Sequence, residues 1–142
     1  MKVEVKMADG LTLIAKGESG HWIVMDGTEE FGGNEAATKP MELFLISLAG
    51  CTAMDVISLL KKMRVNFHDL RIKLEAERKD EHPKIFTSIN LEYIIYGNDL
   101  NKDKIETAIE KSQGKYCSAS AMLKEIVPIK YNYKVISVNN IL

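Results

Sequence analysis

The chain contains two cysteines, and their sequence surroundings differ. Cys51 lies in the most apolar stretch, residues 43–60, whereas Cys117 follows Lys115 at the expected start of a helix. The partial positive charge at a helix N-terminus favours a thiolate, and an apolar setting three turns into a helix disfavours one. The local sequence therefore predicts that Cys117 is the more reactive thiol. It leaves open inert packing, a structural disulfide, or a peroxidatic and resolving pair.

Asp55 lies one helical turn after Cys51, so the two side chains share a helix face. A carboxylate there opposes formation of a thiolate, and a buried Asp needs a partner. We therefore expect a cation close to this pair, with Arg78 and Lys115 as candidates. The alternative is that Asp55 caps or pairs elsewhere among the helices.

Glu42 lies in the first turn of the same expected helix, where a carboxylate stabilises the helix dipole. It precedes Cys51 by nine residues, which at 100° per residue places the two on opposite sides of a straight helix. The spacing therefore favours a structural role for Glu42.

The potential metal ligands are scattered, because three histidines lie far apart in sequence and the cysteines are 66 positions apart, at 51 and 117. Metal sites usually draw several ligands from close spacings. Phosphate-binding loops and dinucleotide fingerprints are also absent. The sequence therefore predicts no metal and no cofactor.

Size and charge predict one domain spanning residues 1–142 that binds no nucleic acid, since 19 Lys and Arg balance 20 Asp and Glu. The N-terminus alternates charged and apolar residues, unlike a secretory signal, which favours a cytoplasmic protein. A reducing cytosol disfavours a permanent disulfide. Residues 43–60 approach transmembrane length, but Asp55 at the centre of a membrane span costs about 2.5–3.5 kcal/mol. A buried helix without membrane contact is the preferred interpretation.

The expected elements form one α+β domain. An N-terminal antiparallel meander begins with a hairpin closed at Asp9-Gly10, and a second turn is expected at Asp26-Gly27 after an apolar run at 22–25. A flexible loop at 31–39 leads to a long helix at 40–63. Strands at 66–77 and 84–96 form a second hairpin, and a helix at 101–113 stops at Gly114. A short helix at 118–125 and a strand at 129–135 follow.

The helix at 40–63 is apolar on nearly every face. One small sheet covers only one side of a helix, so a second chain, or an unusually wrapping fold, is expected to cover the rest.

Four short segments resemble the OsmC/Ohr family of thiol peroxidases. They are Lys-Pro-Met-Glu-Leu at 39–43, Leu-Ala-Gly-Cys-Thr-Ala at 48–53, Lys-Tyr-Cys-Ser at 115–118 and Met-Leu at 122–123. The order of expected elements agrees with the OsmC-like fold over nearly the whole chain.

The resemblance implies an intertwined homodimer in which two strand layers wrap the central helices and each active site lies between subunits. It implies a hydroperoxide reductase, a peroxiredoxin-like enzyme of oxidative stress, in which Cys51 reduces an organic hydroperoxide and becomes a sulfenic acid. Cys117 then resolves this acid as a disulfide. Dithiols, notably lipoyl groups, reduce such disulfides in the family. This reverses the local ranking of the two thiols.

The chain differs from the peroxidases it resembles at two supporting positions. Those proteins use an arginine from the N-terminal region, whereas the first arginine here is Arg64. Their catalytic glutamate directly follows the proline, where this chain has Met41, and Glu42 is displaced by one position. A shift of one residue turns a helical side chain by about 100°.

We therefore expect Asp55, with Arg78 or Lys115, to replace the missing pair. Two other functions fit the same sequence. One is a non-peroxidase of this fold that binds an apolar small molecule in the cleft between subunits, with the cysteines kept for packing or as a redox sensor. The other is a purely structural dimer.

Overall fold

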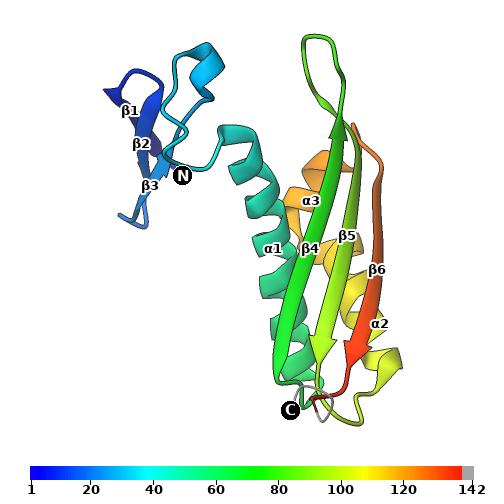
Figure 1. The fold of residues 1–142 in the computed structure, drawn as a ribbon. Coiled ribbons are helices and arrows are strands. Elements are labelled where there is room, and N and C mark those ends of the chain that lie inside the picture. Colours follow the sequence, from blue (N-terminus) through cyan, green and yellow to red (C-terminus); the bar gives the residue numbers. More distant parts are fainter. Residues whose placement is uncertain (139–142) are drawn as a thin grey trace. The chain divides into compact units, whose positions relative to one another are not determined.

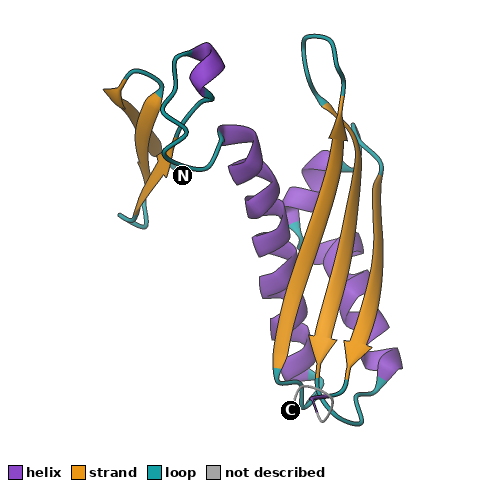
Figure 2. Cartoon of the chain, in the orientation of Figure 1, coloured by secondary structure: helices purple, strands orange, loops and turns teal. Residues whose placement is uncertain are grey.

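The structure is a computed structural model that describes residues 1–138 (Figures 1 and 2). It divides into two compact units, Met1–Ile46 and a second that begins at Ser47. Each unit is described below by itself. Whether residues 1–142 act as one domain remains a prediction.

The first unit holds a three-stranded antiparallel meander in the order β1-β2-β3, as the sequence predicts. Its strands are β1 (Val3–Asp9), β2 (Thr12–Gly17) and β3 (Trp22–Met25). The turn between β1 and β2 contains Gly10 at a φ of 53°, in the left-handed region that favours glycine. The expected hairpin at Asp9-Gly10 is therefore confirmed.

One face of this meander is apolar throughout. Val5 pairs with Ala15, and Ala15 pairs with Ile23, so all three side chains lie on the same face. Val5 and Ile23 remain about half exposed, at 53% and 49%. The strands of the first unit thus leave this face open to solvent.

The expected second turn at Asp26-Gly27 is wrong. Asp26 instead holds the segment that follows β3, because its carboxylate accepts hydrogen bonds from the backbone N–H groups of Gly27, Asn34 and Ala36 and from the Thr12 hydroxyl. The segment includes a 3₁₀ turn, η1 (Glu29–Phe31), and ends in a parallel bridge between Met25 and Thr38. A buried carboxylate thus organises what looked like a simple hairpin turn.

The long helix α1 (Pro40–Lys62) agrees with the expected helix at 40–63. Its buried residues recur every four positions and form one stripe: Leu48, Thr52, Val56 and Leu60. Several apolar side chains off this stripe are exposed, including Met54 at 74%. Among the described residues, α1 is thus fully buried along one stripe only, and the expected cover for its other faces remains a prediction.

Within residues 1–138, α1 is the one helix whose length and mean hydropathy of 2.0 would let it cross a membrane. The core helix of a soluble protein has the same length and composition. The contacts of α1 favour a core helix over a membrane span, because Val56 and Leu60 join the apolar core of the second unit.

The second unit is a three-stranded sheet with helices on one face (Figure 1). β4 (Asp69–Arg78) and β5 (Phe86–Tyr96) form the expected hairpin, and β6 (Ile129–Ile136) pairs with β5 in parallel. The core lies between sheet and helices, where β5 contributes Leu91, Tyr93 and Ile95. The structure therefore confirms the α+β class.

The helix expected at 101–113 is shorter and does not stop at Gly114. It forms α2 (Lys102–Lys111), and the chain then continues in a π-helical segment, η2 (Ser112–Tyr116), before α3 (Ser118–Leu123). The Cys117 N–H donates to the Ser112 carbonyl at 2.8 Å across this segment. π-helical turns are rare and often occur at functional sites. Here the turn separates α2 from the second cysteine.

Candidate functional site

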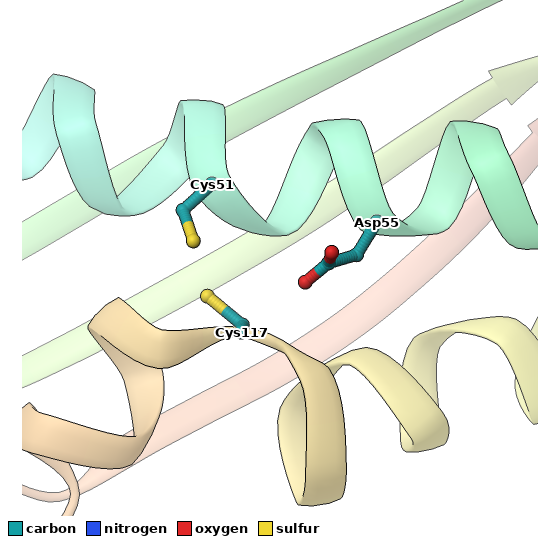
Figure 3. Close-up of side chains that lie close together, drawn as sticks. All are labelled: Cys51, Asp55 and Cys117. Carbon is teal, nitrogen blue, oxygen red and sulfur yellow. The ribbon is translucent and has the colours of Figure 1, made fainter.

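The structure brings Cys51, Asp55 and Cys117 together. The two sulfur atoms and a carboxylate oxygen of Asp55 all lie within 4.8 Å of one another. Cys51 and Asp55 project from one face of α1, and Cys117 points toward them from the start of α3 (Figure 3). Residues far apart in sequence thus form one cluster of thiols and a carboxylate.

The two thiols differ in exposure. Cys51 is half-buried, whereas Cys117 is 1% exposed. Burial raises the pKa of the Cys117 thiol above its ordinary value, and a hydrogen bond with Cys51 adds to the rise. A hydrogen bond from the Ser120 N–H, at 3.4 Å, opposes this rise. The local prediction that Cys117 is the more reactive thiol is therefore wrong, because burial outweighs the favourable helix start.

A buried hydrogen-bond network lies in the core next to this cluster. Thr52, the residue after Cys51, shares hydrogen bonds with the hydroxyls of Tyr93 at 2.6 Å and Ser112 at 2.9 Å. The Gln113 amide donates to Thr52 at 3.0 Å and to Tyr93 at 2.7 Å. Because Ser112 and Gln113 open the π-helical segment, the network ties α1 to the chain that carries Cys117.

Asp55 is connected to the same network. The Ser112 hydroxyl donates to Asp55 Oδ2 at 3.3 Å. Asp55 also lines a pocket of about 90 Å³ together with Lys62 and Tyr116. Sequence reasoning missed Ser112 and Lys62. The i to i+7 spacing of Asp55 and Lys62 on one helix could have revealed Lys62.

Arg78 and Lys115, the expected cationic partners of Asp55, have other contacts. Arg78 Nε donates to the Lys84 carbonyl at 2.7 Å, near the tip of the β4–β5 hairpin. Lys115 Nζ lies 5.5 Å from the centre of the Tyr116 ring. No ion pair of Asp55 occurs within residues 1–138.

Glu42 lies in the first turn of α1, as expected. Its carboxylate accepts a hydrogen bond from the Lys39 N–H at 3.1 Å, immediately before the helix. A backbone donor that the helix leaves unpaired is thereby satisfied. This contact agrees with the structural role that its position in the sequence favours.

The cluster can support two kinds of chemistry. The two sulfur atoms lie within 4.8 Å, whereas an S–S bond is about 2.05 Å long. The two thiols can therefore form a disulfide when their side chains rotate toward each other. Two thiolates and a carboxylate are also ligands that a soft or borderline metal ion accepts. The sequence left the disulfide open, but the long separation of the cysteines concealed the metal-ligand cluster.

Three comparisons agree with this fold. The model of the family described as OsmC-like protein matches residues 32–132. Protein YhfA of Escherichia coli strain K12 is 40% identical over 96% of this chain and 99% of its own length. A crystal structure of a hypothetical protein from Aquifex aeolicus is 32% identical, covers 96% of each chain and has a TM-score of 0.84.

More distant structures share the fold alone. A Legionella pneumophila protein described as an organic hydroperoxide resistance protein OsmC is 20% identical, covers 95% of this chain and 98% of its own, and has a TM-score of 0.70. The family model covers both cysteines, and the curated relative covers nearly the whole chain. The chain therefore belongs to the OsmC-like protein family.

Proposed function

We propose that the protein is a thiol-dependent peroxidase that reduces organic hydroperoxides through Cys51 and Cys117. The observation that carries this proposal is the approach of the two sulfur atoms to within 4.8 Å, with one thiol half-buried and the other enclosed. The hydroperoxide resistance protein from Legionella pneumophila shares the fold and supports the same chemistry.

The unequal exposure assigns the two roles. A peroxide must reach the sulfur that it oxidises, and Cys51 is the more accessible thiol. Cys117 is buried, and its raised pKa keeps it protonated until Cys51 is oxidised. Cys51 is therefore the peroxidatic cysteine in this proposal and Cys117 the resolving one.

The reaction balances in three steps. The Cys51 thiolate attacks the O–O bond of a hydroperoxide ROOH, and with one proton this gives the sulfenic acid and the alcohol ROH. The Cys117 thiolate attacks the sulfenic sulfur and releases hydroxide, which takes up the thiol's proton as water. A dithiol such as a lipoyl group then reduces the disulfide and is itself oxidised to a disulfide.

Asp55 is the supporting residue for this chemistry. The Ser112 hydroxyl holds its carboxylate beside the two thiols. From there it can take the proton from the Cys117 thiol and pass it to the hydroxide that leaves Cys51 when the disulfide forms. Lys62, which lines the same pocket, supplies a cation that the first expectation sought in Arg78 or Lys115.

A homodimer completes the proposal. The meander leaves an apolar face open, and α1 leaves Met54 and other apolar side chains exposed. Open apolar surfaces of this kind mark interaction sites. A second copy of this chain would cover them, as the apolar helix expected at 40–63 already suggested. We place the protein in the cytoplasm, where dithiol reductants are present.

The test is a count of free thiols and an intact mass after brief exposure of the reduced protein to one equivalent of cumene hydroperoxide. We expect the wild type to lose both thiols and two hydrogens. Cys117→Ser should gain one oxygen, and Cys51→Ser should keep its thiol. The two serine variants serve as controls for each other because each retains one cysteine.

Two results would contradict the proposal. If the wild type keeps both thiols, the protein is no peroxidase for this class of substrate, and binding of an apolar molecule by the same fold becomes the better explanation. If Cys51→Ser reacts as fast as the wild type, the two roles are reversed.

A further inference from the structure

We infer that the reduced protein binds one Zn²⁺ ion through Cys51, Asp55 and Cys117. The three potential ligand atoms lie within 4.8 Å of one another. In a tetrahedral zinc site with Zn–S bonds of about 2.3 Å and Zn–O bonds of about 2.1 Å, ligand atoms are roughly 3.5–3.8 Å apart. The present separations of at most 4.8 Å exceed that spacing by no more than about 1.3 Å, so the ligand atoms need to move only a short way.

The ligand types favour zinc over the common hard cations. Two thiolates suit a borderline-soft ion such as Zn²⁺, whereas Mg²⁺ and Ca²⁺ prefer sites made of oxygen atoms alone. Three protein ligands leave a fourth position for water. Cys51 is half-buried, so an ion has a route to the cluster.

The surrounding contacts hold the ligands in place. Cys51 and Asp55 are four residues apart on α1, a spacing that lets two side chains of one helix bind the same ion. The Ser112 hydroxyl donates to Asp55 Oδ2, and the Ser120 N–H donates to Cys117 Sγ. Hydrogen bonds to metal ligands from outside the site orient them and increase metal affinity, often by about 10–100-fold.

Binding has a defined proton balance. Zn²⁺ with two thiols and one ionised carboxylate gives a Zn(SR)₂(OOCR) group of charge −1 and releases two protons, because thiolates are the metal-binding form. Lys62 lines a pocket with Asp55, and a cation in that pocket would favour the extra negative charge. Bound zinc would occupy both thiolates and so protect them from oxidation.

The first experiment measures zinc binding by the reduced, chelator-treated protein in competition with a chromophoric chelator. Binding of Co²⁺ in parallel shows whether thiolate-to-cobalt charge-transfer and tetrahedral d–d bands appear. We expect one ion per chain and the release of two protons. Asp55→Asn should weaken binding at least about tenfold, and Cys51→Ser or Cys117→Ser should remove the stoichiometric site.

Matched controls separate this site from chance binding. Asp103→Asn changes an exposed acidic residue in the first turn of α2 and should bind zinc like the wild type. Wild-type protein whose thiols are blocked by N-ethylmaleimide should not bind, which tests the thiols without any substitution in the chain. Absence of stoichiometric binding, or binding that survives thiol blocking, would overturn the inference. An Asp55→Asn affinity equal to that of the wild type would overturn the three-ligand site.

The inference does not rest on peroxide reduction, although both use the same thiols. Zinc binding is measured without peroxide and without turnover. Protein that binds zinc but whose thiols, in the zinc-free form, survive exposure to peroxide would uphold the zinc site and contradict the proposed function. Protein that forms the disulfide but binds no zinc would do the reverse.

Discussion

The hydroxyls of Thr52 and Tyr93 lie 2.6 Å apart and join α1 to the central strand β5 one residue after Cys51. Both residues are fully buried. The Gln113 amide donates to both hydroxyls, so each of them has more than one partner. Burial also raises the pKa of the Tyr93 phenol, which keeps the hydroxyl protonated and able to donate. The position of Cys51 is thus fixed by polar contacts as well as by packing.

Tyr93→Phe should destabilise the protein by about 1–3 kcal/mol, because it removes the hydrogen bonds of the Tyr93 hydroxyl with Thr52 and Gln113 from a buried network. Chemical denaturation measures this loss as a lower midpoint. The double variant Thr52→Val/Tyr93→Phe should lose less than the sum of the two single variants, since the residues interact directly. Additive losses would mean that the hydrogen bond contributes little.

Ser112→Ala should slow disulfide formation relative to oxidation of Cys51. The substitution removes the hydrogen bonds to Thr52 and Asp55 that tie the π-helical segment to α1. A misplacement of about 1 Å between reacting groups can cost about 100-fold in rate, so a slowing of about tenfold is expected. Trapping of the sulfenic acid with dimedone against time separates the two steps.

The matched control for Ser112→Ala is Ser118→Ala, which changes an exposed hydroxyl next to Cys117. It should leave both steps unchanged. A Ser112→Ala protein that oxidises Cys51 and closes the disulfide at wild-type rates would show that the network does not position Cys117.

Cys117 should react slowly with alkylating reagents in the Cys51→Ser variant. Burial raises the pKa of its thiol, and each pH unit below the pKa lowers the thiolate fraction about tenfold. The alkylation rate should therefore keep rising above the pH at which a free cysteine reaches its plateau. Denatured protein supplies the reference. A native profile that reaches its plateau at or below the pH of the denatured profile contradicts the raised pKa.

Local sequence signals predicted the elements whose geometry is local. Asp9-Gly10 predicted a hairpin because the turn needs a residue at positive φ, and Gly10 has one. The helix expected at 40–63 forms at Pro40–Lys62, so its limits were predicted to within one residue. Family motifs predicted the fold and the pairing of the two cysteine segments, which spacing alone left open.

The errors share a cause in contacts between distant residues. Gly114 looked like a helix stop, but the chain passes through it in a π-helical segment whose Ser112 is bonded to Thr52, 60 positions earlier. Asp26 looked like a turn residue until Asn34 and Ala36 supplied its hydrogen bonds. Cys117 looked reactive because it lies at a helix start. The burial that raises the pKa of its thiol depends on the folded core, which the local sequence does not show. Local sequence patterns do not show contacts between distant residues directly.

Asp26 should make stability depend on pH in the acid range. Although desolvation raises the pKa of its carboxyl, the hydrogen bonds from Ala36, Gly27, Thr12 and Asn34 outweigh this effect and lower it below the ordinary value. A lowered folded pKa stabilises the protein above the unfolded pKa of about 3.9, and this stabilisation is lost as the pH falls through the folded value. Asp26→Asn should therefore lower the thermal midpoint at pH 7.

The difference between wild type and Asp26→Asn should shrink as the pH falls below about 4, because the wild-type carboxyl is then protonated as well. Glu35→Gln, in the same segment but exposed, should show no such pattern. A difference between Asp26→Asn and the wild type that stays constant from pH 7 to acid would contradict the role of the ionised carboxylate.

The apolar face of the meander should mediate dimer formation. Ile23 and Val24 are neighbours on β3 with similar exposure, at 49% and 45%, but they point to opposite faces. Ile23 shares its face with Val5 and Ala15, whereas Val24 shares its face with Ile14 and Lys6. A lysine at position 23 would thus enter a wholly apolar surface, and one at position 24 would join a face that already carries charge.

Size-exclusion chromatography followed by light scattering measures dimer formation as the molar mass of the eluted protein. The wild type should have twice the 16.0 kDa mass of one chain. Ile23→Lys should shift the equilibrium to monomer or unfold the first unit, because an unpaired charge within an apolar interface costs several kcal/mol. Val24→Lys should remain dimeric. A wild-type protein that is monomeric at micromolar concentration would contradict the dimer, and an Ile23→Lys protein that stays dimeric would place the interface on another surface.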